Sequence, residues 1–257
     1  MKGAVLFFSL LALHAMRASP ALPSRTAGRN AVIIRGQIQD VYYYPAKSPA
    51  VSPNPVLFLG GDAGFRGFAV DLAQSMSQWG YDVYSLDTKR YLESFTGKTT
   101  LKEDDVMNDF GQMAAWIDPA RVRRISLVGW SEGAGLCLLG AAPPQNKELF
   151  SGLVTLGLPG QSALGWRLAD DLTWITKAPP QEPAFRSAEY MPKVAPLRLW
   201  MLQSTKDEYV PLETSRALFA AAREPKKFSA IEANNHRFEG NQKELFRLLA
   251  EGLHWLN

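Results

Sequence analysis

The stretch SLVGWSEGAGLCLLGAA, from Ser126 to Ala142, decides the fold. An apolar run ends in Gly129-Trp130-Ser131-Glu132-Gly133, and small and aliphatic residues follow at helical spacing. This pattern predicts a buried strand, a sharp turn at Ser131 and then a helix. The two glycines remove side chains that would clash as the backbone turns, which leaves the serine hydroxyl exposed. Ser131 is therefore either a polar residue in a tight turn or a nucleophile held above a sheet.

On both sides of this stretch, apolar segments alternate with amphipathic ones. The chain has 257 residues, of which 46% are hydrophobic, enough for one sizeable core. Most predicted strands are apolar throughout, which is typical of parallel strands covered on both faces. We expect one α/β domain over residues 22–257, with a mostly parallel central sheet and helices on both faces. The predicted strands are AVIIRG, IQDVYYYP, VLFLGG, YDVYSLD, RRISLVGW, FSGLVTLGLP, LRLWMLQS and KKFSAIEA, and the predicted helices are FRGFAVDLAQSMSQWG, LKEDDVMNDFGQMAAWI, EGAGLCLLGAA, PLETSRALFAAARE and NQKELFRLLAEGLHWL.

Residues 1–21 have the pattern of an export signal. Lys2 supplies a positive charge, Ala4–Leu13 form an apolar run too short to span a bilayer, and RASPA offers small residues for cleavage after Ala18 or Ala21. The sequence therefore predicts a periplasmic or secreted protein. The alternative is that these residues form a buried N-terminal helix of a cytosolic protein.

Composition excludes several classes of function. The formal net charge of +3 is too balanced to indicate a nucleic acid partner. Cys137 is the single cysteine and lies among leucines, so it is expected to be a small buried hydrophobic residue. With three scattered histidines and one cysteine, no metal ligand set is apparent, and neither a metal nor another cofactor is expected.

One segment, residues 160–195, interrupts the alternation of strands and helices. It is long, mixed in character and punctuated by prolines, and a segment of this length is usually a functional lid or disordered. Leu168, Leu172 and Ile175 recur at helical spacing within it. We therefore expect a small cap with a short helix rather than disorder.

Ligands of parallel sheets bind beyond the carboxyl ends of the strands. Gly61, Asp87, Ser131 and Asp207 all follow predicted strands. Their common position indicates a site at that edge of the sheet.

A serine nucleophile needs a base, and His236 follows the last predicted strand. His14 lies in the export signal, and His254 lies in the terminal amphipathic helix. His236 is thus the candidate base almost by elimination.

The acid that orients the base has more than one candidate. Asp207 follows the strand LRLWMLQS directly, and Glu208 competes with it. Asp170 and Asp171 in the cap compete less seriously. The charged run Lys206-Asp207-Glu208 is alternatively a solvated turn. With Asp207, the order serine, acid, histidine is that of the α/β-hydrolases.

Backbone N–H groups can stabilise an oxyanion next to such a serine. The N–H of Glu132 opens the helix, and the loop GGDAGFRG after VLFLGG can supply a second donor from Asp62 or Ala63. The alternatives for this loop are a simple turn or a phosphate cradle, although it lacks the Gly-Lys-Ser/Thr ending of a nucleotide-binding loop.

Three motifs carry a family resemblance: GGDAGFRGFA, SLDTKRYLESF and NHRFEGNQKELFRLLAEGL. Together with the Ser131 turn, they make the sequence similar to the α/β-hydrolase superfamily. Within that superfamily, it resembles the bacterial virulence protein VirJ and the related C-terminal domain of AcvB. The family pattern Asp-x-x-Arg-Tyr is matched by Asp87, Arg90 and Tyr91, whereas its Gly-Asp-Gly-Gly-Trp stands here as Gly61-Asp62-Ala63-Gly64-Phe65.

The resemblance implies a periplasmic serine hydrolase that releases the amino acid from aminoacylated phosphatidylglycerol, in a family first described as an accessory to type IV secretion. Contact with a membrane surface would follow from a lipid ester substrate. DEYVPLETSRALFAAA is more similar to generic carboxylesterases, so a small-molecule ester remains an alternative. A thioesterase, a peptidase and a non-catalytic binding or secretion-accessory protein with this fold also remain open.

Three residues are candidates for contact with the substrate: Phe65, Trp130 and Arg90. Lys89 and Arg90 either meet a lipid phosphate or are solvated loop charges. Asp62 or Glu132 is a candidate partner for a substrate ammonium group.

Overall fold

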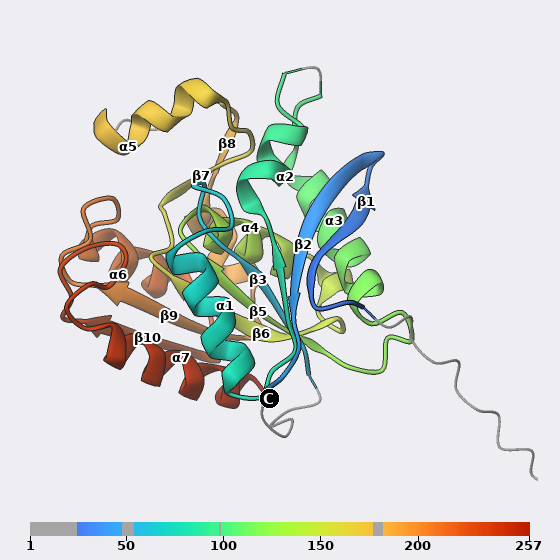
Figure 1. The fold of residues 1–257 in the computed structure, drawn as a ribbon. Helices are drawn as coiled ribbons and strands as arrows, with labels where there is room; N and C mark the ends of the chain where they lie inside the picture. Colours follow the sequence, from blue (N-terminus) through green and yellow to red (C-terminus); the bar gives the residue numbers. More distant parts are fainter. Residues whose placement is uncertain (1–24, 48–53, 98, 177–181) are drawn as a thin grey trace, which may run out of the picture.

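The computed structural model describes residues 25–47, 54–97, 99–176 and 182–257, so the predicted export signal lies outside the described residues. An eight-stranded sheet occupies the centre, in the order β1-β2-β4-β3-β5-β6-β9-β10 (Figure 1). Its strands are β1 (Gly28–Ile34), β2 (Gln37–Tyr44), β3 (Val56–Leu59), β4 (Val83–Leu86), β5 (Ile125–Trp130), β6 (Phe150–Leu156), β9 (Arg198–Ser204) and β10 (Lys226–Ile231).

The strands from β4 to β10 in this order run parallel, whereas β2 is antiparallel to both of its neighbours. Every residue of β3, β5 and β6 is buried, as expected for central strands with helices on both faces. In the β1–β2 hairpin at the edge, several residues are exposed. The predicted mostly parallel α/β sheet is confirmed.

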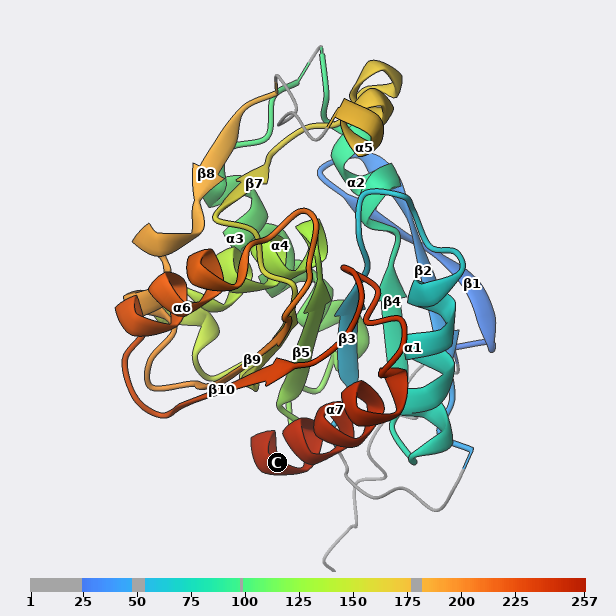
Figure 2. The same ribbon diagram turned by 90° about the vertical axis from the view of Figure 1, so that its left-hand side faces the viewer.

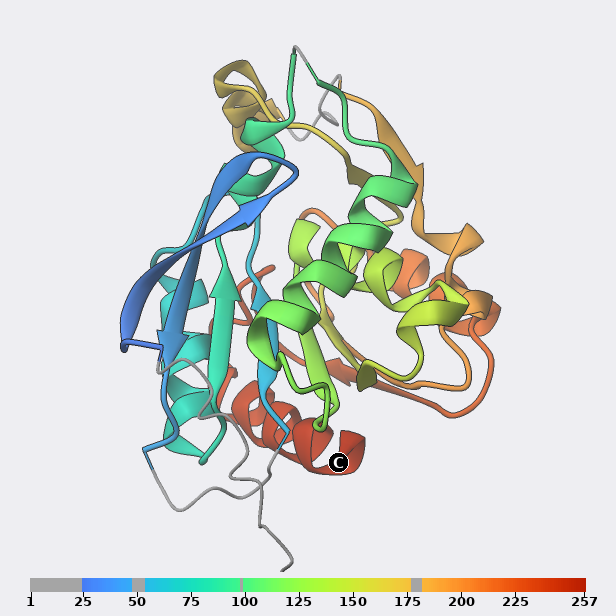
Figure 3. The same ribbon diagram turned by 90° about the vertical axis from the view of Figure 1, so that its right-hand side faces the viewer.

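The helices form one layer on each face of the sheet (Figures 2 and 3). Helices α1 (Phe68–Gln78) and α7 (Gln242–Leu256) contribute to one hydrophobic cluster. Helices α3 (Glu103–Ile117), α4 (Glu132–Ala141) and α6 (Leu212–Ala221) contribute to the other. All residues of α4 are buried, because it lies between the sheet, α3 and the segment that follows β6. Within the described ranges, no helix combines the length and the apolar character needed to cross a bilayer.

Helix α2 (Thr88–Ser94) follows β4 directly and was not among the predicted helices. The carboxylate of Asp87 caps it by accepting the Arg90 N–H at 3.2 Å. Aspartate is a favoured N-cap residue, so the motif SLDTKRYLESF contained the information for this helix.

The segment predicted as a cap holds short elements beyond the carboxyl end of the sheet (Figure 1). Strands β7 (Gln161–Ala163) and β8 (Ala184–Arg186) pair antiparallel, and η2 (Leu168–Leu172) and α5 (Thr173–Thr176) lie between them in the chain. The remaining short helices are η1 (Pro144–Asn146) after α4, and η3 (Ser187–Glu189) and η4 (Met191–Lys193) after β8. Strands of three residues are too short to produce a detectable sequence pattern, so the β7–β8 pair was not predicted.

Candidate active site

Ser131 forms the sharp turn between β5 and α4. Its backbone has φ 57° and ψ −128°, a conformation that non-glycine residues rarely adopt and that persists only where the surroundings hold it. The Ser131 N–H donates to the carbonyl oxygen of Leu156 at 3.0 Å, and the Ser131 carbonyl oxygen accepts the Ala134 N–H at 2.8 Å. The end of β6 and the first turn of α4 thus fix the strained residue.

The glycines on either side of Ser131 are sterically required. A methyl group on Gly129 would lie 2.6 Å from the carbonyl oxygen of Gly133 and 2.7 Å from the nitrogen of Ala134. A methyl group on Gly133 would overlap the carbonyl groups of Leu59 and Gly60 at the end of β3. The two glycines of the motif are therefore required because the end of β5, the start of α4 and the end of β3 lie in close contact.

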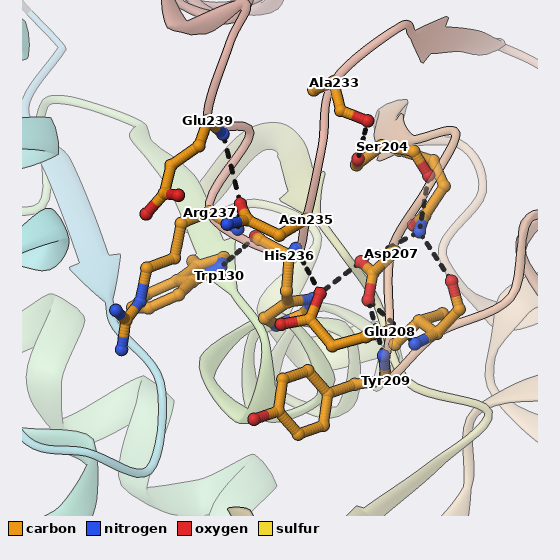
Figure 4. A network of polar contacts seen from close by, with 12 residues as sticks. Trp130, Ser204, Asp207, Glu208, Tyr209, Ala233, Asn235, His236, Arg237 and Glu239 are labelled. Atoms are coloured by element: carbon orange, nitrogen blue, oxygen red, sulfur yellow. Dashed lines mark hydrogen bonds and ion pairs between the residues drawn. The ribbon is translucent and has the colours of Figure 1, made fainter.

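Asp207 and His236 meet at the same edge of the sheet, after β9 and β10. Oδ2 of Asp207 lies 2.6 Å from Nδ1 of His236, and their side chains are 0% and 7% exposed. Oδ1 of Asp207 accepts the N–H groups of Tyr209 and Val210, each at 2.9 Å. Figure 4 shows this network. Burial favours the protonated carboxyl, but the hydrogen bond and charge of His236 and these N–H groups outweigh burial, so the pKa of Asp207 lies below its ordinary value.

Gln203 supports the Asp207 carboxylate and was not predicted from the sequence. Its Nε2 donates to Oδ2 of Asp207 at 3.0 Å and to the carbonyl oxygen of Val210 at 2.8 Å. Gln203 is the first polar side chain after the apolar run of β9, and it is buried. A buried side-chain amide needs hydrogen-bond partners. The position of Gln203 four residues before Asp207 therefore indicated a hydrogen bond between the two side chains.

The competing acids have other partners. Oε2 of Glu208 accepts the backbone N–H of His236 at 2.8 Å. Oδ2 of Asp170 accepts the N–H of Arg167 at 2.7 Å in the cap segment, and the side chain of Asp171 lies outside the described residues. Asp207 is thus the carboxylate that contacts the imidazole.

Ser131 and His236 both lie over the end of β6. The carbonyl oxygen of Leu156 accepts from Ser131, and a methyl group on the next residue, Gly157, would lie 2.6 Å from Cε1 of His236. The rings of Trp130 and His236 are 5.7 Å apart. Nε2 of His236 is buried and has no hydrogen-bond partner among the described residues. The geometry brings the imidazole next to the Ser131 turn without a direct hydrogen bond to its hydroxyl.

The loop after β3 lies against the same turn. A methyl group on Gly61 would be 3.3 Å from Cβ of Ser131, and the Gly64 N–H donates to the Gly61 carbonyl oxygen at 3.4 Å across Asp62 and Ala63. In the described part of the chain, neither the Ala63 N–H nor the Glu132 N–H donates a hydrogen bond to another residue. Both groups are therefore available to an incoming acceptor.

The side chain of Glu132 is buried and connects α4 to the segment after β6. Its Oε2 accepts the N–H of Ala163 in β7 at 3.0 Å. Burial, and secondarily the negative charge of Asp62, raise the pKa of Glu132 to about 8. Burial therefore favours the protonated form of the Glu132 carboxyl group.

The substrate-contact candidates have partners within the protein. The indole of Trp130 is buried and its Nε1 donates to the carbonyl oxygen of His236 at 3.2 Å. Phe65 is half-buried and stacks on Tyr42 with ring centroids 4.4 Å apart. Arg90 is paired with Asp40 at 3.2 Å, so its charge is partly compensated.

Among the described residues, no group of three His, Cys, Asp or Glu side chains could hold a metal ion. Cys137 is buried, as predicted, and burial raises the pKa of its thiol well above the ordinary value. The thiol donates a weak hydrogen bond, at 3.5 Å, to the carbonyl oxygen of Val128. It lies among the residues of the hydrophobic core.

Comparison with solved structures identifies the architecture. The esterase Est1E from Butyrivibrio proteoclasticus superposes with a TM-score of 0.63 at 15% identity, over 90% of this chain and 99% of its own. A monoacylglycerol lipase from Paleococcus ferrophilus gives 0.61 at 14% identity, over 85% and 99%. The esterase domain of a Rhodothermus marinus protein gives 0.54 at 20% identity, over 88% and 95%. The chain has the α/β-hydrolase fold.

The narrower resemblance is also confirmed. The family model described as bacterial virulence protein (VirJ) matches residues 54–169, which is less than half of the chain. This range of the α/β-hydrolase fold includes the Gly61 loop, Asp87 and the Ser131 turn, but Asp207 and His236 lie outside it. No protein of curated function matches the chain in sequence.

Proposed function

We propose that this protein is a serine hydrolase that cleaves carboxylic esters, with Ser131, His236 and Asp207 as its catalytic residues. The observation that carries the proposal is the 2.6 Å contact between Asp207 and His236 beside the strained Ser131 turn, with Nε2 of His236 buried and without a hydrogen-bond partner among the described residues. An imidazole oriented at Nδ1 by a carboxylate is suited to take a proton at Nε2. A structural role for the pair would not require Nε2 to stay unpartnered beside a serine.

In the proposed reaction, Oγ of Ser131 attacks the acyl carbon while its proton moves to Nε2 of His236. The tetrahedral intermediate then collapses, the bond from carbon to the alcohol oxygen breaks, and His236 returns the proton to that oxygen. Water attacks the resulting acyl-enzyme by the same proton transfers, which releases the acid and restores Ser131. Asp207 stabilises the imidazolium that forms in both steps.

The negative oxygen of each tetrahedral intermediate needs donors that are already in place. We assign the N–H of Glu132 and an N–H of the Asp62–Ala63 turn to this function. The Glu132 N–H opens α4, where the helix dipole favours negative charge. Two observations support the second donor: the Ala63 N–H makes no hydrogen bond within the described part of the chain, and Gly61 lies close to Ser131.

For the substrate, we propose an aminoacyl ester of phosphatidylglycerol, on the basis of the resemblance to VirJ. A lipid ester would be hydrolysed at a membrane surface. Leu168, Leu172 and Ile175 in η2 and α5 are more than half exposed, and these elements lie beyond the carboxyl end of the sheet (Figure 1). We propose that this segment acts as a cap and contacts the bilayer, and that the protein functions in the periplasm or outside the cell after loss of residues 1–21.

The enzymatic proposal is tested with a fluorophosphonate probe and p-nitrophenyl acyl esters. Labelling and turnover are expected for the wild type and are expected to be abolished by Ser131→Ala. Ser126→Ala is the matched control, because Ser126 lies on the same strand and its hydroxyl contacts Ser151 at 2.9 Å, away from the site. Absence of labelling in the folded wild type, or persistent turnover in Ser131→Ala, would overturn the proposal and favour a non-catalytic binding protein.

The substrate is tested separately with vesicles of lysyl-phosphatidylglycerol. Release of lysine by the wild type but not by Ser131→Ala would support the lipid substrate. Cleavage of p-nitrophenyl esters without release of lysine would retain the hydrolase and reject the aminoacyl lipid. Deletion of the gene is expected to raise the aminoacylated lipid content of the cells.

A further inference from the structure

The peptide groups of His236 are held on both sides by side chains from other elements. Oε2 of Glu208 accepts the His236 N–H at 2.8 Å, and Nε1 of Trp130 donates to the His236 carbonyl oxygen at 3.2 Å. Figure 4 shows both contacts around the imidazole. The ring of His236 is held independently through Nδ1 by Asp207.

The contact of Trp130 with His236 comes from a different element than the contacts of Glu208 and Asp207 with His236. Glu208 and Asp207 belong to the loop after β9, whereas Trp130 is the last residue of β5 and immediately precedes Ser131. The indole N–H therefore joins the nucleophile turn to the loop that carries the base, across 106 positions of sequence. Since Nε2 of His236 has no hydrogen-bond partner among the described residues, the serine hydroxyl does not itself make this connection.

Packing against neighbouring residues fixes the position of the Trp130 indole. Trp130 is 5% exposed, and Phe68 at the start of α1 contacts its ring edge to face with centroids 5.0 Å apart. A methyl group on Gly61 would lie 3.5 Å from the Trp130 ring, so the loop after β3 also borders it. Packing on both sides determines the direction of the N–H bond.

We propose that Trp130 is a positioning residue for hydrolysis: its indole N–H fixes the main chain of His236 relative to Ser131, so that Nε2 lies within reach of the serine hydroxyl. This inference rests on the proposed function. Catalytic groups must be held within about 0.5 Å of the productive geometry. A displacement of about 1 Å costs roughly a hundredfold in rate.

The test is Trp130→Phe, which keeps an aromatic ring and removes the N–H donor. Trp200→Phe is the matched control, because Trp200 is also buried in the same hydrophobic cluster and its Nε1 donates to the hydroxyl of Ser229 at 3.0 Å. Both variants lose one indole hydrogen bond and part of one buried ring. We expect similar losses of Tm in the two variants.

For Trp130→Phe we expect kcat toward p-nitrophenyl acetate and the rate of fluorophosphonate labelling to fall about tenfold to a hundredfold, with KM within about twofold. We expect Trp200→Phe to keep the wild-type kcat. Equal kcat values in the two variants, or a change confined to KM, would overturn the positioning role. An inactive, unlabelled wild type would instead overturn the proposed function.

Should the phenylalanine variant fail to fold, site-specific incorporation of benzothienylalanine at position 130, and at position 200 as the control, replaces the indole N–H by sulfur at nearly the same volume. The expected outcome is again a loss of kcat at position 130 alone. Full activity with sulfur at position 130 would overturn the proposal.

Discussion

Oδ2 of Asp207 lies 2.6 Å from Nδ1 of His236, although 29 positions separate the two residues. The parallel pairing of β9 and β10 explains this contact, because the loops that follow two neighbouring parallel strands emerge at the same edge of the sheet. Asp207 comes three positions after the end of β9, and His236 comes five positions after the end of β10. The sheet topology thus brings the acid and the base together.

Asp207→Asn is expected to lower kcat by about four orders of magnitude, the effect of this change in serine protease triads, because the amide favours the wrong imidazole tautomer. The matched control is Glu208→Gln, in which the side-chain oxygen can still accept the His236 N–H. Initial rates with p-nitrophenyl acetate provide the measurement. A larger loss in Glu208→Gln than in Asp207→Asn would reverse the assignment of the acid.

Gly157→Ala is expected to displace the imidazole. The added methyl group would lie 2.6 Å from Cε1 and 2.9 Å from Nδ1 of His236, and Gly157 has φ +57°. We expect kcat to fall at least tenfold, and the free energy of unfolding to fall by about 1 kcal/mol from backbone strain alone. Gly160→Ala serves as the control, because its methyl group would meet only a methyl of Thr214 at 3.2 Å. Wild-type kcat in Gly157→Ala would show that the imidazole is not confined as described.

The central sheet was predictable because β3, β5 and β6 are mainly apolar segments between helical patterns. Ser131, Asp207 and His236 were identified as candidates because strand ends share one edge and few histidines compete. Helix α2 was not predicted, because its seven residues are too few to show a helical repeat and only the N-cap Asp87 marks its start.

Long-range polar contacts were the feature of the site that was hardest to predict from the sequence. The indole of Trp130 and the carbonyl oxygen of His236 lie 106 positions apart, and nothing in the local sequence of Trp130 distinguishes a hydrogen bond to the base loop from a substrate contact. Glu208 and Asp207 are adjacent carboxylates, and only the path of the loop determines which reaches the ring. Such partners depend on tertiary geometry rather than on periodicity.

Cys137 is expected to be inert in the folded protein. Its side chain is buried in α4, and the raised pKa of the thiol keeps the reactive thiolate scarce. Iodoacetamide is therefore expected to leave ester hydrolysis unchanged and to alkylate Cys137 only in urea, as measured by mass spectrometry. Rapid alkylation without denaturant, or loss of activity on alkylation of the native protein, would contradict this burial.

Glu132→Gln is expected to remove a pH dependence of stability. The folded pKa of Glu132 is raised to about 8, chiefly by burial, so the native state binds one more proton than the unfolded state between roughly pH 5 and 8. Because the native state holds the extra proton, the wild-type free energy of unfolding includes a contribution that falls by about 1.4 kcal/mol per pH unit across that interval.

The glutamine variant does not titrate, and its amide oxygen can still accept the Ala163 N–H. The free energy of unfolding of Glu132→Gln, measured relative to that of the wild type, should therefore increase steadily as the pH rises from 5 to 8. Urea unfolding at each pH measures the difference, in which the contributions of the other groups cancel. Asp62→Asn is the companion variant, because removing the neighbouring charge should shift the Glu132 transition to lower pH. A difference between wild type and Glu132→Gln that stays constant from pH 5 to 8 would mean that Glu132 is ionised throughout, with its charge solvated or paired.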